Sequence, residues 1–456
     1  MIRYDLKTVA AITGGTVIGD ESKVIEGAAF DSRTVQNGNL FVPIIGTRVN
    51  GHDYVAPLYE KGQIAASLWR RDQENRPEGV DLVVVENVEE AFRALAAAYR
   101  RTLQTVIIGI TGSSGKTSTK DIISSVLAVK YKVHKTFANQ NNELGVPLTV
   151  CSIDQDDDYA VIEMGISEIG EMDMLADLVR PDLTVITNIA PAHIMNFHDM
   201  DTIVKQKCTI NKNLTSGRCY YAVDAYGLDD YIRNYQRDIQ RTAYGFGPRA
   251  TFQVVGFHFE DFGMSFEMAD GTTYRLPVLG RHQITNALSA IAIARDIGMS
   301  QSEIQLGLDN VTLTPHRLQI RKIGQATIID DCYNSNPGSL AASLELLTGY
   351  QKEVKKAVVL GDMLELGENE RELHANVADS VDFGNFQEIY LYGPLMKSLA
   401  DRLTEEGIEC HHYEDRDALK HDLEHLLDTY CIILFKASNG MKFIDLIRDL
   451  EANHEN

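Results

Sequence analysis

The sequence predicts an α/β protein built from three domains. Its 456 residues exceed what one hydrophobic core usually organises. Near-continuous β-branched runs alternate with helical segments, which is typical of parallel sheets buried on both faces. This pattern stops and begins again near residue 314. We therefore expect a small mixed α/β domain, a central domain with a mostly parallel sheet and helices on both faces, and a C-terminal Rossmann-like α/β domain, over residues 1–98, 99–313 and 314–456.

The elements follow in chain order. The first domain has strands near 40–43 and 81–85, and a helix over 88–101 leads out of it. The central domain opens with a strand at 106–110 and continues with strands at 159–163 and 183–187. We expect antiparallel excursions over 220–280 and a closing helix over 284–297. After the Thr312-Leu313-Thr314-Pro315 linker, we expect four further strands, at 327–330, 357–360, 388–392 and 431–435.

Composition excludes several classes of protein. A formal net charge of −22, with no offsetting basic stripe, disfavours binding to nucleic acids or anionic membranes. No apolar run approaches the roughly 18 residues of a membrane span. The N-terminal residues lack the pattern of a signal peptide, so we expect a cytoplasmic protein. The six cysteines contain no CxxC pair and are interpreted as reduced structural thiols.

A glycine-rich loop is the strongest local signal. The segment GITGSSGKTS, residues 109–118, follows a buried strand and precedes a helix, the setting in which backbone N–H groups bind phosphate. Lys116 would reach the β and γ phosphates of ATP, and the Thr117 hydroxyl would bind Mg²⁺. The alternative is a simple turn with a surface lysine. The predicted nucleotide-binding residues here are Gly112, Ser113, Ser114, Gly115, Lys116, Thr117 and Ser118.

Three side chains suggest a second functional cluster. Glu163 ends a buried strand and His193 follows the next one, at the sheet edge where α/β proteins bind ligands. Either could instead be structural or solvated. Lys207 continues the apolar series of Ile203 and Ile210 along a helix, so it lies on the face meant for burial. A buried lysine loses its proton or finds an anion, unless its stem carries the ammonium to the surface.

The order of motifs resembles the Mur ligase family, ATP-dependent amide-forming enzymes of peptidoglycan synthesis. These motifs are the glycine-rich loop, EMG, TNIxxxH, the lysine 14 residues on, GRHxxxNALxA and PHRL. The resemblance implies that CO₂ carbamylates Lys207. It also implies two Mg²⁺ sites, one served by Thr117 and Glu163 and the other by His193 and Lys207. This chain has Cys208-Thr209 where the family often has an acidic residue.

Further residues are assigned to the nucleotide by the same resemblance. Asn286 would contact adenine or ribose, although at a first helical turn it could simply be a cap. Arg317 would reach the phosphates on domain closure, or remain an exposed linker arginine. Asp331 belongs to a pair of carboxylates that follows a strand. Such a pair either faces a ligand or forms a turn.

The third-domain motifs DDxYNxNP and LGDMxELGE resemble the family members that add D-alanyl-D-alanine to UDP-N-acetylmuramoyl-tripeptide. Asn334, Asn336, Lys436 and Ser438 would then bind substrate, although Lys436 and Ser438 could form a strand-end turn. In the first domain, the DSR segment resembles the family's UDP-binding residues. The predicted substrate-binding residues of the first two domains are Ser32, Arg33, Asn141 and Asn142.

We therefore expect an ATP-dependent ligase that forms an acyl phosphate on the tripeptide and transfers it to D-alanyl-D-alanine. Arg317, Lys116, His193 and Lys207 would be its catalytic residues. We expect a monomer without nucleic-acid partners or membrane insertion. The alternatives are a Mur-type ligase that adds a single amino acid, and a nucleotide-dependent switch without ligase activity.

Overall fold

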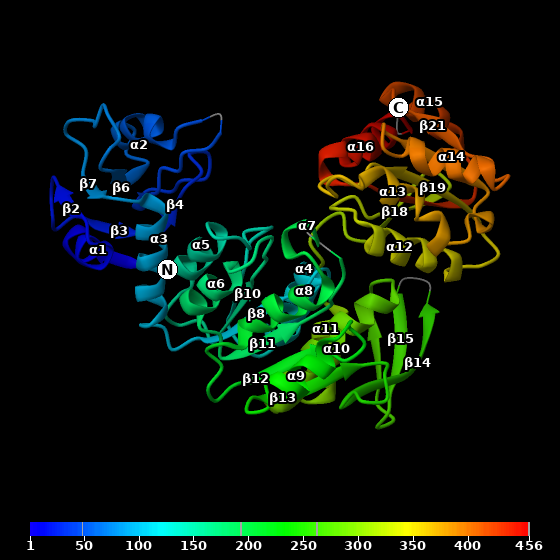
Figure 1. Cartoon of the computed structure of the whole chain (residues 1–456), viewed down its shortest axis with the longest axis horizontal. Coiled ribbons are helices and arrows are strands. Elements are labelled where there is room, and N and C mark those ends of the chain that lie inside the picture. Colours follow the sequence, from blue (N-terminus) through cyan, green and yellow to red (C-terminus); the bar gives the residue numbers. More distant parts are fainter. Residues whose placement is uncertain (48, 192–193, 261–262, 455–456) are drawn as a thin grey trace.

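The computed structural model describes residues 1–47, 49–191, 194–260 and 263–454. It has three α/β units, each built on its own main sheet, and the central unit lies at the base of an arch between the other two (Figure 1). This confirms the predicted fold class. Among the described residues, no helix combines the length and apolar character needed to cross a membrane.

The first unit is a five-stranded mixed sheet with a separate two-stranded ribbon. The sheet order is β2-β7-β6-β5-β4, parallel except between β2 and β7. Its elements are β1 (Arg3–Asp5), α1 (Leu6–Thr13), β2 (Thr16–Ile18), β3 (Val24–Glu26), β4 (Ala28–Ala29), β5 (Asn39–Phe41), α2 (Val55–Glu60), β6 (Ile64–Arg70), β7 (Leu82–Val85) and α3 (Val88–Arg100).

The central unit has a nine-stranded sheet, in the order β16-β15-β14-β13-β12-β11-β8-β10-β9. Its elements are β8 (Val106–Thr111), α4 (Lys116–Leu127), β9 (Val133–Lys135), α5 (Gly145–Ser152), β10 (Tyr159–Glu163), α6 (Glu171–Val179), β11 (Leu183–Ile186), α7 (Ile194–Phe197), α8 (Met200–Cys208), β12 (Arg218–Ala222), α9 (Leu228–Tyr235), β13 (Gln240–Gly245), β14 (Phe252–Glu260), β15 (Gly263–Met268), β16 (Thr273–Leu276), α10 (Arg281–Asp296) and α11 (Gln301–Asp309).

Helices cover both faces of this sheet, as predicted. Ile108 and Ile110 of β8 pack into the core formed with α4 and α10. Ile107, which alternates with them along the strand, packs instead into the core formed with α3, α5 and α6. Successive strand side chains point to opposite faces, so the unbroken apolar run of β8 reflects burial on both sides.

The expectation for residues 220–280 was partly wrong. β12, β13 and the start of β14 extend the parallel sheet, and α9 crosses between β12 and β13. Only β14, β15 and β16 are antiparallel. β12 begins with Arg218 and β13 begins with Gln240 and Arg241, and these polar strand starts hid the parallel pattern. Helix α11 was also not anticipated.

The third unit has a six-stranded sheet, in the order β17-β18-β22-β19-β20-β21, parallel except between β17 and β18. Its elements are β17 (Gln319–Ile323), β18 (Ala326–Asp330), α12 (Pro337–Gly349), β19 (Lys355–Gly361), α13 (Glu370–Ala375), β20 (Glu388–Tyr392), α14 (Lys397–Glu405), β21 (His411–Tyr413), α15 (Arg416–Leu427), β22 (Cys431–Lys436) and α16 (Phe443–His454). The four predicted strands are β18, β19, β20 and β22.

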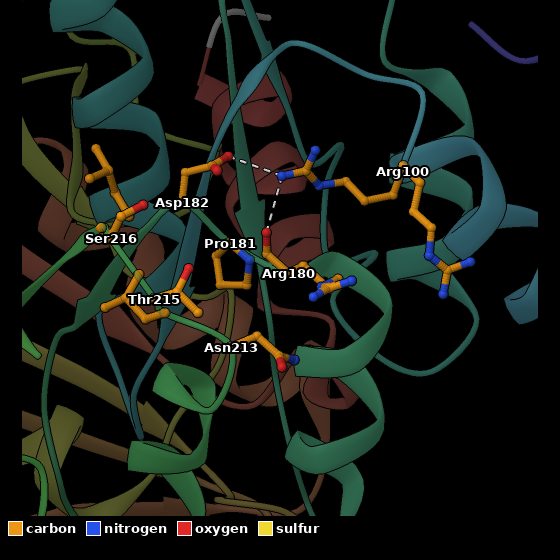
Figure 2. A pocket seen from close by; sticks show the side chains of 11 residues that line it. Arg100, Arg180, Pro181, Asp182, Asn213, Thr215 and Ser216 are labelled. Atoms are coloured by element: carbon orange, nitrogen blue, oxygen red, sulfur yellow. Dashed lines mark hydrogen bonds and ion pairs between the residues drawn. The ribbon is translucent and has the colours of Figure 1, made fainter.

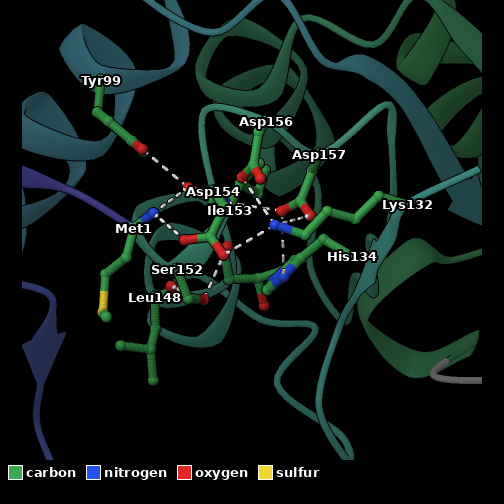
Figure 3. A network of polar contacts seen from close by, with 11 residues as sticks. Met1, Tyr99, Lys132, His134, Leu148, Ser152, Ile153, Asp154, Asp156 and Asp157 are labelled. Atoms are coloured by element: carbon green, nitrogen blue, oxygen red, sulfur yellow. Dashed lines mark hydrogen bonds and ion pairs between the residues drawn. The ribbon is translucent and has the colours of Figure 1, made fainter.

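The first unit is fastened to the central one through its N-terminus. The Met1 ammonium donates to the Ile153 carbonyl (2.6 Å) and to Asp154 Oδ1 (2.7 Å), and the Tyr99 hydroxyl donates to the same carbonyl (2.8 Å), as Figure 3 shows. Lys132 pairs with the neighbouring Asp154, Asp156 and Asp157. Lys132 and the Met1 ammonium together offset most of the charge of these three aspartates, whose role is therefore structural.

A buried histidine should make the stability of the first unit depend on pH. His52 is 4% exposed, its Nε2 accepts from the Arg70 N–H, and burial lowers its pKa to about 4. The unfolded chain, with a pKa near 6.5, takes up the proton first as pH falls. Stability is therefore complete above about pH 6.5 and decreases towards pH 4, by on the order of 2 kcal/mol.

The fluorescence of Trp69, the sole tryptophan, measures this effect, because its ring lies 4.8 Å from the His52 imidazole. Urea unfolding at pH 7.5 and pH 5 should show a smaller loss of stability in His52→Gln than in the wild type. Equal losses in the two proteins would rule out His52 as the titrating group.

Candidate active site

The phosphate loop has the predicted strand–loop–helix setting, between β8 and α4. Gly112 and Gly115 adopt φ values of +150° and +81°, a region that side chains disfavour. A Cβ at Gly112 would lie 2.0 Å from Thr187 Oγ1. The loop therefore packs against the residue that follows β11, and only glycine allows this close approach.

Thr187 and Asn188 brace the loop, a role that the sequence did not reveal. Thr187 Oγ1 donates to the Ser114 carbonyl (2.6 Å). Asn188 Nδ2 donates to Ser114 Oγ (2.9 Å), and the Asn188 carbonyl accepts from the Ser113 N–H (2.8 Å). Both residues belong to the TNI motif. The position of this motif at the end of a strand was the only feature of the sequence that could have indicated their role.

Removing this brace should weaken nucleotide binding. Thr187→Val keeps the side-chain shape but loses the hydrogen bond to Ser114. The loop is then no longer preorganised for the phosphates before the nucleotide binds. We expect the Kd for ATP to rise about tenfold, measured by titration calorimetry with Mg²⁺. Thr187→Ser should retain wild-type affinity. Thr184→Val is the matched control, because that hydroxyl bonds Asn211 rather than the loop; an equal loss there would refute the interpretation.

Glu163 is the centre of a buried oxygen-rich cluster. Its carboxylate, 1% exposed, accepts from Thr117 Oγ1 (3.1 Å) and from Asn141 Nδ2 (2.8 Å). The predicted residues Thr117, Asn141 and Glu163 are thus together, although they come from three different segments. Oxygen donors of this kind are the ligands that Mg²⁺ prefers.

Two lysines lie close to this cluster. Lys116 Nζ donates to the Gly112 carbonyl (2.8 Å), and burial lowers its pKa while Glu163 acts in the opposite direction. Lys207 on α8 is 3% exposed, which confirms the burial predicted from its helical position. Burial and the nearby Lys116 charge lower the pKa of Lys207 well below its ordinary value. His193 lies outside the described residues.

Arg317 joins the third unit to the phosphate loop. Its Nη2 donates to Thr117 Oγ1 (3.2 Å), and its guanidinium carbon lies 4.1 Å from the centre of the Tyr333 ring. Its Nε is buried and has no hydrogen-bond partner among the described residues. Arg317 is therefore stacked on the Tyr333 ring, and its Nε–H is still available to donate a hydrogen bond.

In the third unit, Lys436 bonds two of the other predicted residues. This ammonium, 2% exposed, donates to Asp331 Oδ2 (2.5 Å) and to the Asn334 carbonyl (3.2 Å). Ser438 Oγ accepts from the Leu364 N–H (2.9 Å), which ties the LGDMxELGE segment to the loop after β22. Asn336 caps α12 by accepting from the Ser339 N–H (2.9 Å).

One cleft of about 1350 Å³ brings most of these residues together. Its lining includes the predicted residues Ser113, Ser114, Gly115, Lys116, Thr117, Ser118, Asn141, Asn142, Glu163, Asn286, Arg317, Asp331, Asn334, Asn336, Lys436 and Ser438. Lys207 is not in this lining. Neither are Ser32 and Arg33 of the first unit, where Arg33 pairs with Asp31 at 2.6 Å and its side chain is 86% exposed.

An aromatic part of the cleft lining was not anticipated. Phe246, Phe257 and Phe259 line it, and the Arg281 guanidinium carbon lies 4.2 Å from the centre of the Phe246 ring. These phenylalanines come from the 240–260 segment, whose parallel strands the sequence did not reveal. Asn286 lies against Gly115 of the phosphate loop and donates to Gln283 Oε1 (2.9 Å) rather than acting as a helix cap.

A second cavity, of about 500 Å³, lies before β11 and β12, at the opposite sheet edge from the phosphate loop. Arg100 enters it but is already paired. Its guanidinium donates to Asp182 Oδ2 (3.0 Å) and to the carbonyls of Val179 and Arg180 (2.8 and 3.1 Å), and Figure 2 shows two of these bonds. This arginine closes the C-terminal end of α6, so the cavity is structural.

Comparison with known proteins agrees with this geometry. The sequence matches the Mur ligase family catalytic domain over residues 24–100, the Mur ligase middle domain over 110–294 and the Mur ligase glutamate ligase domain over 316–439. It is 34% identical to the UDP-N-acetylmuramoyl-tripeptide--D-alanyl-D-alanine ligase of Bacillus subtilis (strain 168), covering 99% of both chains.

Further relatives span the same length. The Escherichia coli (strain K12) ligase of that name is 30% identical, again over 99% of both chains. A crystal structure of MurF from Acinetobacter baumannii has a TM-score of 0.88 and 26% identity, covering 99% of both chains. From the loop, the carboxylate cluster and these full-length matches, the chain belongs to the Mur ligase family.

Proposed function

We propose that this protein is an ATP-dependent ligase that joins D-alanyl-D-alanine to UDP-N-acetylmuramoyl-tripeptide, in the cytoplasm, for peptidoglycan synthesis. The observation that carries the proposal is the shared cleft, where the phosphate loop of one unit faces Lys436 and Asp331 of another. Full-length relatives carrying that name in Bacillus subtilis and Escherichia coli support the same substrates.

ATP would bind across the junction of the central and third units. The loop residues 112–118 would hold its phosphates, Asn286 its nucleoside and Arg317 its terminal phosphate. Asp331 was assigned to the nucleotide, but its ion pair with Lys436 favours a role in holding that lysine for the incoming dipeptide. Asn334, Asn336 and Ser438 line the same cleft.

The enzyme would hold two Mg²⁺ ions. Thr117 and Glu163 offer a hydroxyl and a buried carboxylate for one. Lys207, carbamylated by CO₂, would serve the second together with His193. A buried amine with a strongly lowered pKa supports carbamylation, because the neutral amine is the form that reacts with CO₂. When bound, the metals neutralise phosphate charge.

The chain's own groups would then drive two steps. The tripeptide carboxylate attacks the γ-phosphate of ATP to give an acyl phosphate and ADP, with Lys116 and Arg317 cancelling the repulsion between the anions. The dipeptide amine next attacks the acyl carbonyl and phosphate leaves. Closure of the third unit would assemble the groups and exclude water, which would hydrolyse the acyl phosphate.

The UDP-linked substrate would extend from Ser32 and Arg33 towards Asn141 and Asn142. Asn142 also shapes its loop by accepting from the Gly145 N–H (2.9 Å). We propose domain boundaries at 98/99 and 313/314, as the sequence suggests, and a monomeric enzyme.

The test is phosphate release from Mg-ATP with UDP-N-acetylmuramoyl-tripeptide, with and without D-alanyl-D-alanine, followed by mass analysis. We expect phosphate and a UDP-pentapeptide only when both substrates are present. Release with a single amino acid instead would indicate another Mur-type ligase. ATP turnover that ignores both substrates would indicate the switch and refute the proposal.

A further inference from the structure

Asp121 is a buried carboxylate on α4, the helix after the phosphate loop. It accepts hydrogen bonds from the linker that leads to the third unit. It is 3% exposed. Its Oδ2 accepts from both the N–H (2.8 Å) and the hydroxyl (2.7 Å) of Thr314, 193 residues away. Its Oδ1 accepts from Lys135 Nζ (2.8 Å), and Lys120 Nζ lies 3.6 Å away. Oδ1 of Asp121 thus bonds a residue of the central unit, and Oδ2 bonds the linker.

The linker beyond Thr314 is fixed to the third unit. His316 Nδ1 lies 2.7 Å from Asp330 Oδ2, and the His316 carbonyl accepts from the Tyr333 N–H (3.0 Å). His316 and Leu318 have φ values of +67° and +51°, which non-glycine residues adopt only when surrounding contacts hold them. Arg317 lies between them and is directed at the phosphate loop.

Helix geometry relates the anchor to the site. Thr117 and Asp121 are four residues apart on α4, so they share one face at a separation of about 6 Å along the axis. Thr314 bonds the second of these residues and Arg317 bonds the first. The linker segment from Thr314 to Arg317 therefore spans a distance that is set by the spacing of Thr117 and Asp121 on α4.

From this arrangement we propose that Asp121 is a positioning residue for the ligase reaction: by holding Thr314 it sets where Arg317 meets the phosphate loop. The proposal rests on the proposed function of this site. If Asp121 served only as an ion-pair partner within the central unit, its linker bonds would not matter for turnover.

The test is a double-mutant cycle on the full-length enzyme. Thr314→Val loses the hydroxyl bond and should lower kcat about tenfold, whereas Thr314→Ser should retain it. In an Arg317→Ala background, Thr314→Val should change kcat no further, because the linker acts through that arginine. Equal losses in both backgrounds, or none in the wild type, would overturn the proposal.

Two further measurements separate this proposal from simpler explanations. Lys135→Met removes the hydrogen bond to the other oxygen of the Asp121 carboxylate, so it should lower the thermal stability and leave kcat within twofold of the wild type. A tenfold loss of kcat in this variant would contradict the linker role. Hydrogen exchange of the 314–318 segment should be faster in Asp121→Asn than in the wild type. That readout needs no ligation, so it remains decisive if the proposed reaction fails, and unchanged exchange would refute the anchor.

Discussion

Replacing Lys207 with methionine should lower kcat by about a thousandfold, the loss expected when a group that stabilises transition-state charge is removed. Methionine has nearly the same length and suits a buried position, so the fold should persist. Among the residues that the structure describes, the Lys207 ammonium has no hydrogen-bond or ion-pair partner, and the residue is 3% exposed. An unpaired buried cation is costly, and carbamylation would convert it into an anion with two oxygens.

The carbamate can be measured directly. Removing CO₂ should reduce the activity of the wild type, bicarbonate should restore it, and ¹³C-bicarbonate should give a carbamate resonance that is absent from Lys207→Met. ATP affinity in the variant reports on the phosphate loop and should change little. Lys212→Met is the matched control, because this exposed lysine pairs with Asp177 (2.9 Å). Full activity in Lys207→Met would refute the assignment.

The parts of the site that could be predicted follow from periodicity and from strand ends. Glu163 could be placed because carboxyl ends of parallel strands meet at one sheet edge. Lys207 could be placed because residues three or four apart on a helix share a face. Both rules use only the local sequence. They fix which way a side chain points, and burial of these two residues confirms them.

The contacts that could not be predicted join residues far apart in the chain. The brace from Thr187 to Ser114 spans 73 residues and the bond from Asp121 to Thr314 spans 193. Local patterns show which face is buried but not which distant segment covers it. The capping role of Asn336 was hidden for a different reason, because an asparagine in a DDxYNxNP motif suits a ligand and a helix start equally.

The second large effect concerns Arg317. Replacing it with alanine should lower kcat by about a thousandfold, the low end of what arginines contribute when they stabilise charge in phosphoryl transfer. The Kd for ATP should rise less than tenfold, because the loop residues bind the phosphates without it. The large effect on kcat is expected because the buried Nε has no hydrogen-bond partner in the part of the chain that the structure describes. Its N–H can therefore bind the negative charge that develops on the phosphate in the transition state.

Two variants separate charge from geometry. Arg317→Lys keeps the charge but loses the planar fork and its stacking on Tyr333, so it should recover less than a tenth of the lost rate. Tyr333→Leu keeps the arginine but removes its aromatic support, and should give an intermediate kcat. Pre-steady-state phosphate release measures the effect on the rate of reaction, and ATP titration measures the effect on the Kd for ATP. If Arg317→Ala raises the Kd for ATP but leaves kcat unchanged, the arginine binds the ground state and the transition state equally well and cannot be the group that recognises the transition state.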